Sequence, residues 1–580
     1  MVFQINKYLV FVLAFFLGIQ CYNFSQTKKI YVGINGKDSN LGLSIDNPLE
    51  TINKAVEKAE AGDSILILPG LYKEIINFVS KNGKPERPIC IVGILDNKGD
   101  YPVIDGGAVN PGMELTNYWI TIDNSSWIEV EKLEFVNGWT YPINLTNSSY
   151  ITFRDCKFFG ARRVVSAEGE NTHHILIEKC FWDQGGEFLW RLESDSQGVD
   201  AWTSMHHGNM LYFNGSIIDF SGTGGSIVIR GNKIINAFNA VRWRGKKGCD
   251  SNIEIYDNDI SRVRDNDFEP EIYTYNLHVY HNKSHNVHRT MSVDNVEGGN
   301  VYYYGNVITT DNDEWTKKVC TGFWKIYGGN VNRSLPMYAF NNSFYGVAKA
   351  ARAEEEMIHF KHFNNAYFFT GDTAWYLNKW NATNEFDYDI CNENWPNIFI
   401  NNDQEKHGKI ADIKFINGLN KDLRLDPVSP GVDRGKVMYL PEFSWRQSFN
   451  GNAPDIGAYE NDNLVEGPPF RFSILQGSNI SYKEKPRIVR HKVTLNKLIL
   501  FFSDKLDTTV SRVNLISVWQ KNKETDVFSV SFANNYEIIV ETKDELSSED
   551  LSVGFGNEIK GLNGEAVTSW ASTIKIKKIK

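Results

Sequence analysis

The chain has 580 residues, of which 42% are apolar and 13% aromatic, so it is long enough to bury a large core and too long for one ordinary globular domain. Its 46 glycines and 26 tyrosines favour β-structure with many tight turns. A net charge of −10 and an isoelectric point near 5.7 argue against nucleic acid as a partner, and seven widely spaced cysteines without a Cys-x-x-Cys pair argue against a disulfide scaffold or a zinc–cysteine site.

The N-terminal segment has the pattern of an export signal. A single charge, Lys7, precedes an apolar run from Tyr8 to Ile19 that is short for a membrane span. We therefore expect residues 1–25 to be a signal peptide that is removed, and we expect no stable membrane insertion. Cys21 leaves a lipoprotein anchor as an alternative, although Gln20 stands where such signals place a small residue.

A repeat of about 24 residues fills the middle of the chain. Segments such as IEIYDNDI and LHVYHNKS alternate apolar and polar residues, as half-buried strands do, and then reach one recurrent position. A strand-rich period of this length, without the leucine consensus of leucine-rich repeats, predicts a right-handed parallel β-helix whose recurrent asparagines form an internal ladder. The recurrent position is occupied by Leu133, Cys156, Cys180, Asn232, Asn258, Asn282 and Asn306, and we expect it to continue at Asn342 and Asn364. Cys156 and Cys180 should then be stacked core thiols and not a disulfide.

The segments on either side of the repeat have the patterns expected of caps that close the two ends of a β-helix. Residues from Ile52 to Ala59 have helical spacing and are followed by the strand and turn SILILPGLY, while SPGVDRG and DIGAYE follow the repeat. These segments resemble the capping and closing segments of secreted bacterial β-helix carbohydrate-active enzymes, the pectate-lyase-like superfamily. The resemblance covers residues 28–460 and implies an all-β catalytic domain that acts on a polysaccharide. We expect the protein to be a monomer. It also implies a secreted, periplasmic or cell-surface location in a bacterium.

The last part of the chain, residues 467–580, has a different pattern. KLILFFSDKLD and FSVSFANNYEIIVET alternate like antiparallel strands with turns between them. This region resembles the immunoglobulin-like accessory modules of secreted bacterial enzymes, and we expect a β-sandwich there. Such a module either binds glycan or acts as a spacer.

The segment RVRDNDFEPEIYTYN carries four carboxylates on alternate residues, which point the same way in an extended chain. Because the interior of a β-helix is apolar, we expect its active groups to point outward from the strand that follows each asparagine. We assume that Val241, Phe268, Met291 and Phe323 point inward. The outward positions are then Arg242, Arg244, Asp267, Glu269, Glu271, Ser292 and Asp294, with Trp324 and Tyr327 on the next coil.

Asp267 and Glu269 are two residues apart, about 6.6 Å between Cα atoms, and this spacing suits the carboxylate pair of a glycoside hydrolase. We therefore expect hydrolysis of an anionic polysaccharide with Asp267 and Glu269 as catalytic residues and no required cofactor. The remaining positions expected to bind substrate are Arg242, Arg244, His288, Arg289, Asp294, Lys325, Trp190 and His207.

Two other functions fit the same residues. In a polysaccharide lyase, Arg242, Arg244, His288, Arg289 and Lys325 would supply the base and neutralise a uronate, while acids such as Asp265 and Glu271 hold Ca²⁺. However, an RHG-like basic strand with an acidic metal partner is absent from the sequence, and RWRG is a poor substitute. In a non-catalytic solenoid the same face would only bind glycan, and the acids would be ordinary solvated side chains.

Overall fold

The structure is a computed structural model. It describes residues 27–468, 486 and 488–578, apart from short segments at 86, 113–117, 140–141, 192–204, 206–210, 247–248, 294–296, 299, 321, 327–335, 348, 354–355, 357, 372–374, 441–444, 503–505, 509–515, 535–536, 548–549, 557–558, 562–565 and 568–573. The predicted signal peptide, His207, Asp294 and Tyr327 lie outside the described residues.

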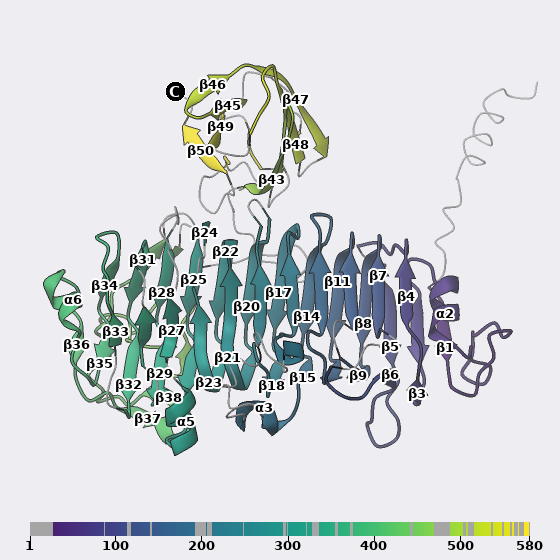
Figure 1. Cartoon of the computed structure of the whole chain (residues 1–580), viewed down its shortest axis with the longest axis horizontal. Helices are drawn as coiled ribbons and strands as arrows, with labels where there is room; N and C mark the ends of the chain where they lie inside the picture. The colour runs from purple at the N-terminus through teal and green to yellow at the C-terminus, as the bar shows by residue number, and fades with distance from the viewer. Residues whose placement is uncertain are drawn as a thin grey trace, which may run out of the picture.

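Most of the chain coils into a parallel β-helix with three faces, as the repeat predicts (Figure 1). Each coil contributes one strand to each face, and every strand pairs in parallel with its counterpart on the next coil. The first face contains β1 (Lys29–Val32), β2 (Ser64–Ile67), β5 (Ile89–Gly93), β8 (Ser126–Glu131), β11 (Ser149–Arg154), β14 (His173–Glu178), β17 (Gly225–Arg230), β20 (Ser251–Tyr256), β22 (Tyr273–Tyr280), β25 (Val301–Tyr304), β28 (Met337–Phe340), β31 (Phe360–Phe363) and β34 (Glu385–Asp387), with β24 (Glu297–Gly298) paired to β22.

The other two faces share two long strands, β21 (Asp259–Glu271) and β23 (Lys283–Ser292), which bend at the corner between them. The second face also contains β3 (Leu71–Tyr72), β6 (Val103–Ala108), β9 (Glu134–Gly138), β12 (Lys157–Phe159), β15 (Phe181–Asp183), β18 (Lys233–Ile235), β26 (Val307–Thr309), β29 (Ser343–Gly346), β32 (Ala366–Phe369), β35 (Ile390–Cys391) and β36 (Lys409–Ile410). The third face also contains β4 (Ile76–Val79), β7 (Ile120–Asp123), β10 (Ile143–Thr146), β13 (Val165–Glu168), β16 (Ile218–Ser221), β19 (Val241–Arg244), β27 (Gly322–Ile326), β30 (Ala351–Ala353) and β33 (Trp375–Leu377).

The predicted asparagine ladder is confirmed. Each ladder amide donates from Nδ2 to the Oδ1 of the next ladder residue over 2.8–3.1 Å, and the backbone N–H of the same residue bonds to the same oxygen. Cys156 and Cys180 continue the ladder position as buried free thiols, as expected. At the other end, Asp389 accepts from Asn365 over 3.0 Å and closes the ladder.

The prediction of Asn364 as a ladder residue is wrong by one position, because Asn365 occupies the ladder and Asn364 precedes it. Asn364 has φ 58°, and the residue before every other ladder position also has a positive φ. These residues are Lys132, Asp155, Lys179, Gly231, Asp257, His281, Gly305, Asn341 and Tyr388. A left-handed residue therefore turns the chain into each ladder position, and asparagine tolerates that conformation better than most residues.

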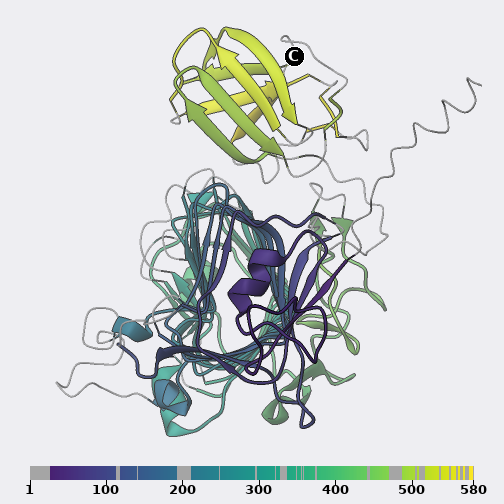
Figure 2. The same ribbon diagram turned by 90° about the vertical axis from the view of Figure 1, so that its right-hand side faces the viewer.

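A short helix closes the N-terminal end of the coil, as predicted. The helix α2 (Ile52–Lys58) lies across the open end (Figure 2), and the Thr51 hydroxyl caps it by accepting from the Lys54 N–H over 3.2 Å. Its buried face joins the β-helix core. The remaining short elements are α3 (Glu187–Arg191), η1 (Leu211–Phe213), α5 (Glu314–Val319), α6 (Asn397–Asn401), β37 (Phe415–Asn417), η2 (Gly418–Asn420), β38 (Asp422–Leu425), β39 (Tyr439–Leu440), β40 (Trp445–Arg446), β41 (Tyr459–Glu460) and β42 (Asn463–Leu464).

The C-terminal part forms two four-stranded sheets around their own apolar core, so the predicted β-sandwich is confirmed (Figure 1). One sheet contains β43 (Ile488–Thr494), β44 (Lys497–Phe502), β48 (Glu537–Thr542) and β47 (Val527–Asn534). The other contains β46 (Lys523–Thr525), β45 (Ile516–Gln520), β49 (Leu551–Phe555) and β50 (Lys575–Lys578). Within the described part of the chain, no helix combines the length and apolar character that crossing a membrane requires.

Replacing a ladder asparagine should destabilise the coil more than replacing an exposed one. Asn258→Ala removes the hydrogen bonds that the Asn258 side chain donates to Asn282 Oδ1 and to the Ile229 carbonyl, and it leaves the buried Asn232 backbone N–H without its acceptor. We expect a loss of about 3 kcal/mol in the free energy of unfolding, measured by chemical denaturation. The exposed Asn97→Ala is the matched control, and equal effects of the two substitutions would contradict a stabilising ladder.

Candidate substrate groove on the third face

One outward column of side chains runs across the third face. Asp219 pairs in register with Arg242, and Arg242 pairs with Glu269. On the following coils Ser292 pairs with Lys325. The inward neighbours Val241, Phe268 and Met291 align with one another in the core, so their predicted orientation is confirmed. We call the outward side of this face, around β19, β21, β23 and β27, the groove face, because the sequence predicts a substrate groove there.

Glu269 is the most perturbed acid of the groove face. Only 4% of the residue is exposed, and its Oε1 accepts from Asn266 Nδ2 over 3.1 Å. Burial, followed by the charge of Asp265, raises the pKa of Glu269 to about 8, against the opposing effects of Arg242 and Lys325. At neutral pH this carboxyl group therefore holds a proton for most of the time.

Glu271, two residues further along β21, has the opposite shift. Its Oε2 lies 2.5 Å from Arg244 Nε and 3.4 Å from Arg242 Nη2. Burial opposes ionisation, but Arg242 and Arg244 together hold the pKa of Glu271 below its ordinary value. Arg242 is itself fixed by the Asn214 side chain over 2.7 Å, and its Nε lies 3.0 Å from Glu269 Oε2. The expected proximity of these arginines to the acids is confirmed.

The outward orientation expected for Asp267 is wrong. Asp267 is completely buried and interacts electrostatically with the core residues Ser284 and Tyr303. Strict alternation fails because the register of β21 with β23 shifts between Val263 and Asn266, at the corner between two faces. Burial raises the pKa of the Asp267 carboxyl well above its ordinary value, with only a partial offset from Ser284, so burial favours its protonated form.

His288 lies where β23 turns onto the third face. Its Nδ1 donates to the carbonyl oxygen of Val319, at the end of α5, so Nε2 carries the ring lone pair. Burial and the nearby cations Arg289, Arg264 and Lys325 hold the pKa of His288 well below its ordinary value. The structure thus brings a neutral imidazole together with three basic side chains, of which Arg289 and Lys325 were predicted as substrate ligands.

Two aromatic predictions change in the structure. Trp190 was expected to line the substrate site, but it is 2% exposed, packs in the core from α3, and its carbonyl accepts from Trp315 Nε1 over 3.0 Å. Trp324 was expected to face outward, but it is the register partner of the inward Met291 and lies in the core. Phe323 also lies in the core, so its predicted inward orientation is confirmed, and two consecutive residues of β27 are buried before Lys325.

The described residues do not fit the calcium site considered for Asp265 and Glu271. Calcium takes six to eight oxygen ligands, whereas Glu271 is already paired with two arginines and Asp265 is 1% exposed. No group of three or more metal-ligating side chains occurs among the residues that the structure describes.

The sequence patterns did not predict three residues that align with or contact Arg242 and Glu269 on the groove face. Asp219 follows from extending the repeat by one coil, because it occupies the place of Arg242 on the preceding strand. Asn266 is adjacent to the predicted acids, but its amide gives no sequence signal for the contact with Glu269. Asn214 reaches Arg242 from 28 residues away through an irregular segment, so no periodic pattern indicates it.

Comparison with known proteins gives limited likenesses, and no family model matches the chain. A stretch of 162 residues is 28% identical to pectate lyase PEL9 of Emericella nidulans, and it covers 26% of this chain and only 37% of that protein. The solved pectate lyase Pel9A is 15% identical, with a TM-score of 0.39, over 75% of this chain and 97% of the other. The alginate lyase AlyGC is 13% identical, with a TM-score of 0.42, over 65% and 54% of the two chains.

Asp267→Asn should change the pH dependence of stability. The raised pKa means that the folded protein binds this proton more tightly than the unfolded chain, so Asp267 costs stability as pH rises above about 4. The asparagine variant lacks this term, and its stability relative to the native chain should rise by up to about 1.4 kcal/mol per pH unit until the folded pKa is reached. Chemical denaturation of both proteins at several pH values between about 4 and 8 measures this difference in the free energy of unfolding. The exposed Asp46→Asn is the control. A difference that does not vary with pH would show that burial does not raise the pKa of Asp267.

Proposed function

We propose that the chain is a polysaccharide lyase that cleaves an acidic, uronate-containing polysaccharide by β-elimination on the groove face. The observation that carries the proposal is the neutral imidazole of His288 beside Arg264, Arg289 and Lys325. The stretch that is similar to a pectate lyase supports the same reaction class. An exported enzyme of this kind would meet its polymer outside the cytoplasm, as the N-terminal signal predicts.

β-Elimination needs a base beside groups that neutralise the uronate carboxylate. In the proposed reaction, Arg289 and Lys325 hold the carboxylate and make the adjacent C5 proton more acidic. His288 Nε2 takes that proton, because its lowered pKa keeps the ring unprotonated at neutral pH. The electron pair released at C5 forms the C4–C5 double bond as the C4–O bond breaks.

The leaving oxygen needs a proton, and Glu269 supplies it in this proposal. The carboxyl group holds a proton at neutral pH because its pKa is raised to about 8. Lys325 acts on both the proposed base and the proposed acid, since its charge lowers the pKa values of His288 and Glu269. Arg242 and Asn266 orient the Glu269 side chain. These steps use only side chains of this protein. The assay with and without a chelator tests whether calcium is also required.

Glycoside hydrolysis is the second candidate, and the opposite pKa shifts of two acids on β21 favour it. Glu269, with a raised pKa, and Glu271, with a lowered pKa, are two residues apart. Carboxyl groups whose environments separate their pKa values in this way are typical acid and nucleophile or base pairs. Against this role, Arg242 and Arg244 both occupy the Glu271 carboxylate. Glu271 replaces the originally expected partner Asp267 in this alternative, because Asp267 lies in the core.

A panel of plant and algal polysaccharides separates the candidates. Reducing ends and the ultraviolet absorbance of the unsaturated uronate are followed together, with and without a chelator. β-Elimination gives both signals, whereas hydrolysis gives reducing ends alone, and that result would overturn the lyase proposal. Loss of the signal with chelator would show that the reaction needs a metal ion in addition to the cations of the chain. Binding without product would favour a glycan-binding solenoid.

His288→Gln should remove the base and retain a hydrogen-bonding side chain. We expect the rate of elimination to fall roughly a hundredfold or more, with a smaller change in KM, because the base acts in the transition state. The control is His407→Gln, since His407 is exposed and bonds to Asp387 outside the groove face. An unchanged rate in the His288 variant would exclude it as the base.

Glu269→Gln and Asp267→Asn are a matched pair that tests which acid of β21 acts in turnover. The glutamine cannot deliver a proton, so turnover should fall at least roughly a hundredfold. The asparagine variant should retain turnover, because Asp267 faces Ser284 and Tyr303 in the core. Loss of activity in a folded Asp267→Asn protein, with activity kept in Glu269→Gln, would reverse this assignment.

A further inference from the structure

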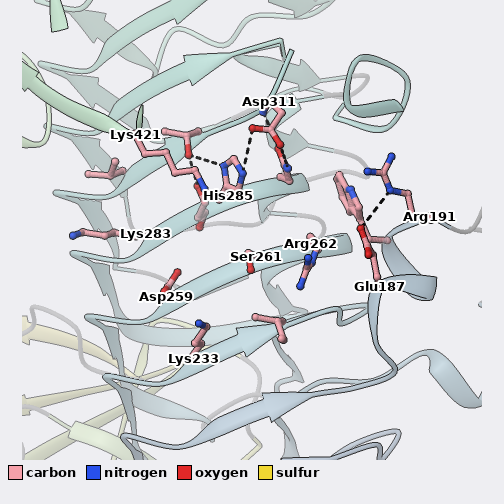
Figure 3. A pocket seen from close by; sticks show the side chains of 16 residues that line it. Glu187, Arg191, Lys233, Asp259, Ser261, Arg262, Lys283, His285, Asp311 and Lys421 are labelled. Atoms are coloured by element: carbon pink, nitrogen blue, oxygen red, sulfur yellow. Dashed lines mark hydrogen bonds and ion pairs between the residues drawn. The ribbon is translucent and has the colours of Figure 1, made fainter. Parts of the chain in front are cut away.

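A cavity of about 610 Å³ lies on the second face of the β-helix, next to the groove face (Figure 3). Its floor consists of outward residues of β18, β21, β23 and β26, and α3 forms one wall. Lys421, which follows η2, lies above His285 from a distant part of the sequence. None of the residues proposed for the elimination reaction lines this cavity.

The cavity is positively charged on a protein whose net charge is −10. Five basic and three acidic side chains line it, an excess of two positive charges when His285 is neutral. Burial and the charge of Lys421 lower the pKa of His285, which supports the neutral form. A positive cavity on an acidic protein attracts an anionic ligand in preference to the rest of the surface.

The basic side chains of the cavity differ in how they are paired within the described residues. Arg191 pairs with Glu187, and Asp311 is held by Asn286 over 2.8 Å and by His285 over 3.5 Å. By contrast, no ion pair or side-chain hydrogen bond involves Lys233, Arg262, Lys283 or Lys421 among the described residues. Arg262 also has a buried Nε without a hydrogen-bond partner and a backbone φ of 57°. A strained residue with an unsatisfied guanidinium N–H in a cavity wall indicates a group that accepts hydrogen bonds there.

The spacing of the charges indicates a polymeric saccharide. Lys233, Asp259 and Lys283 occupy one register column on three successive coils, and all three are exposed. Adjacent coils are about 4.8 Å apart, which is comparable to the length of one sugar unit, so the two lysines are about 10 Å apart. Asp259 lies between the two lysines, and Ser261 lies two residues further along the same strand. The Asp259 carboxylate and the Ser261 hydroxyl can both form hydrogen bonds with sugar hydroxyls. The volume suits a saccharide better than a single inorganic anion.

We propose that this cavity is a second binding site for an acidic saccharide. Its carboxylate or sulfate groups are held by Arg262, Lys421 and the two lysines of the register column, Lys233 and Lys283. The site lies on a different face from the proposed catalytic groove, so it binds a chain segment that is not being cleaved. Its function is to hold the polymer on the enzyme between catalytic events. This role goes beyond the proposed reaction and does not require that reaction to be elimination.

Calorimetry on the full chain tests the site, in a His288→Gln background that prevents cleavage of the ligand. Hexagalacturonate and a sulfated carrageenan hexasaccharide are the two probes, and they distinguish a carboxylate ligand from a sulfate ligand. We expect two binding sites per chain for one of the probes. Lys233→Gln together with Lys283→Gln should weaken one site by roughly fivefold per lysine and leave the other unchanged. Lys409→Gln, an exposed lysine of the same face, is the control.

Activity provides an independent readout with the native His288. The double lysine variant should retain its turnover of short oligosaccharides and lose turnover efficiency on the long polymer. A single binding site that is insensitive to both lysine substitutions would overturn the proposal. Displacement of the probe by an equal concentration of sodium sulfate would also overturn it, because the cavity would then hold an adventitious anion only. Binding without any turnover would refute the proposed reaction and leave this site standing.

Discussion

The hydrogen bonds of the asparagine ladder determine where every outward side chain of the β-helix lies. Each ladder amide bonds to the side chain of one coil and the backbone of another, so neighbouring coils cannot slip by one residue without breaking buried bonds. The strand of the second face begins at the residue after the ladder position in six successive coils, from Lys233 to Ala366. The columns of that face, including the one at Lys233, Asp259 and Lys283, are consequences of this register.

The sequence predicts this part of the fold well because the ladder is both periodic and chemically distinctive. An amide every 24 or so residues, after an alternating segment, is visible without any knowledge of tertiary contacts. The one error occurs at the doublet Asn364 and Asn365, where either residue type could occupy the ladder. Backbone conformation decides the choice: the first residue of the doublet adopts φ 58° and turns the corner, and only the second then points into the ladder.

The third face is less predictable because its strands begin at varying distances from the ladder. The corner between Val263 and Asn266 contains an irregularity that reverses the orientation expected for Asp267, while Phe268 and Glu269 keep theirs. A second pair of asparagines marks this corner, since the Asn266 N–H bonds to Asn239 Oδ1 over 2.9 Å. Non-periodic insertions such as the one that carries Asn214 contribute to the groove through contacts that a repeat pattern cannot reveal.

The two faces differ in how each would attract the proposed anionic ligand: the second face has an excess of basic side chains, whereas the groove face depends on protonation of an acid. On the second face, basic side chains outnumber acids around the cavity, and the pairing of Lys283 is limited to a longer-range effect on the pKa of Asp422. The cavity is therefore positive without any change of protonation. On the groove face, Arg242 lies between Glu269 and Glu271. If both acids were ionised, their negative charges would offset the positive charge of Arg242. Because the pKa of Glu269 is about 8, this acid is mostly neutral at physiological pH, and one of the carboxylates that act on Arg242 is then uncharged. The groove face therefore gains positive potential below about pH 8. In the proposed reaction, the proton that the leaving group needs is also the one that allows a uronate carboxylate to bind.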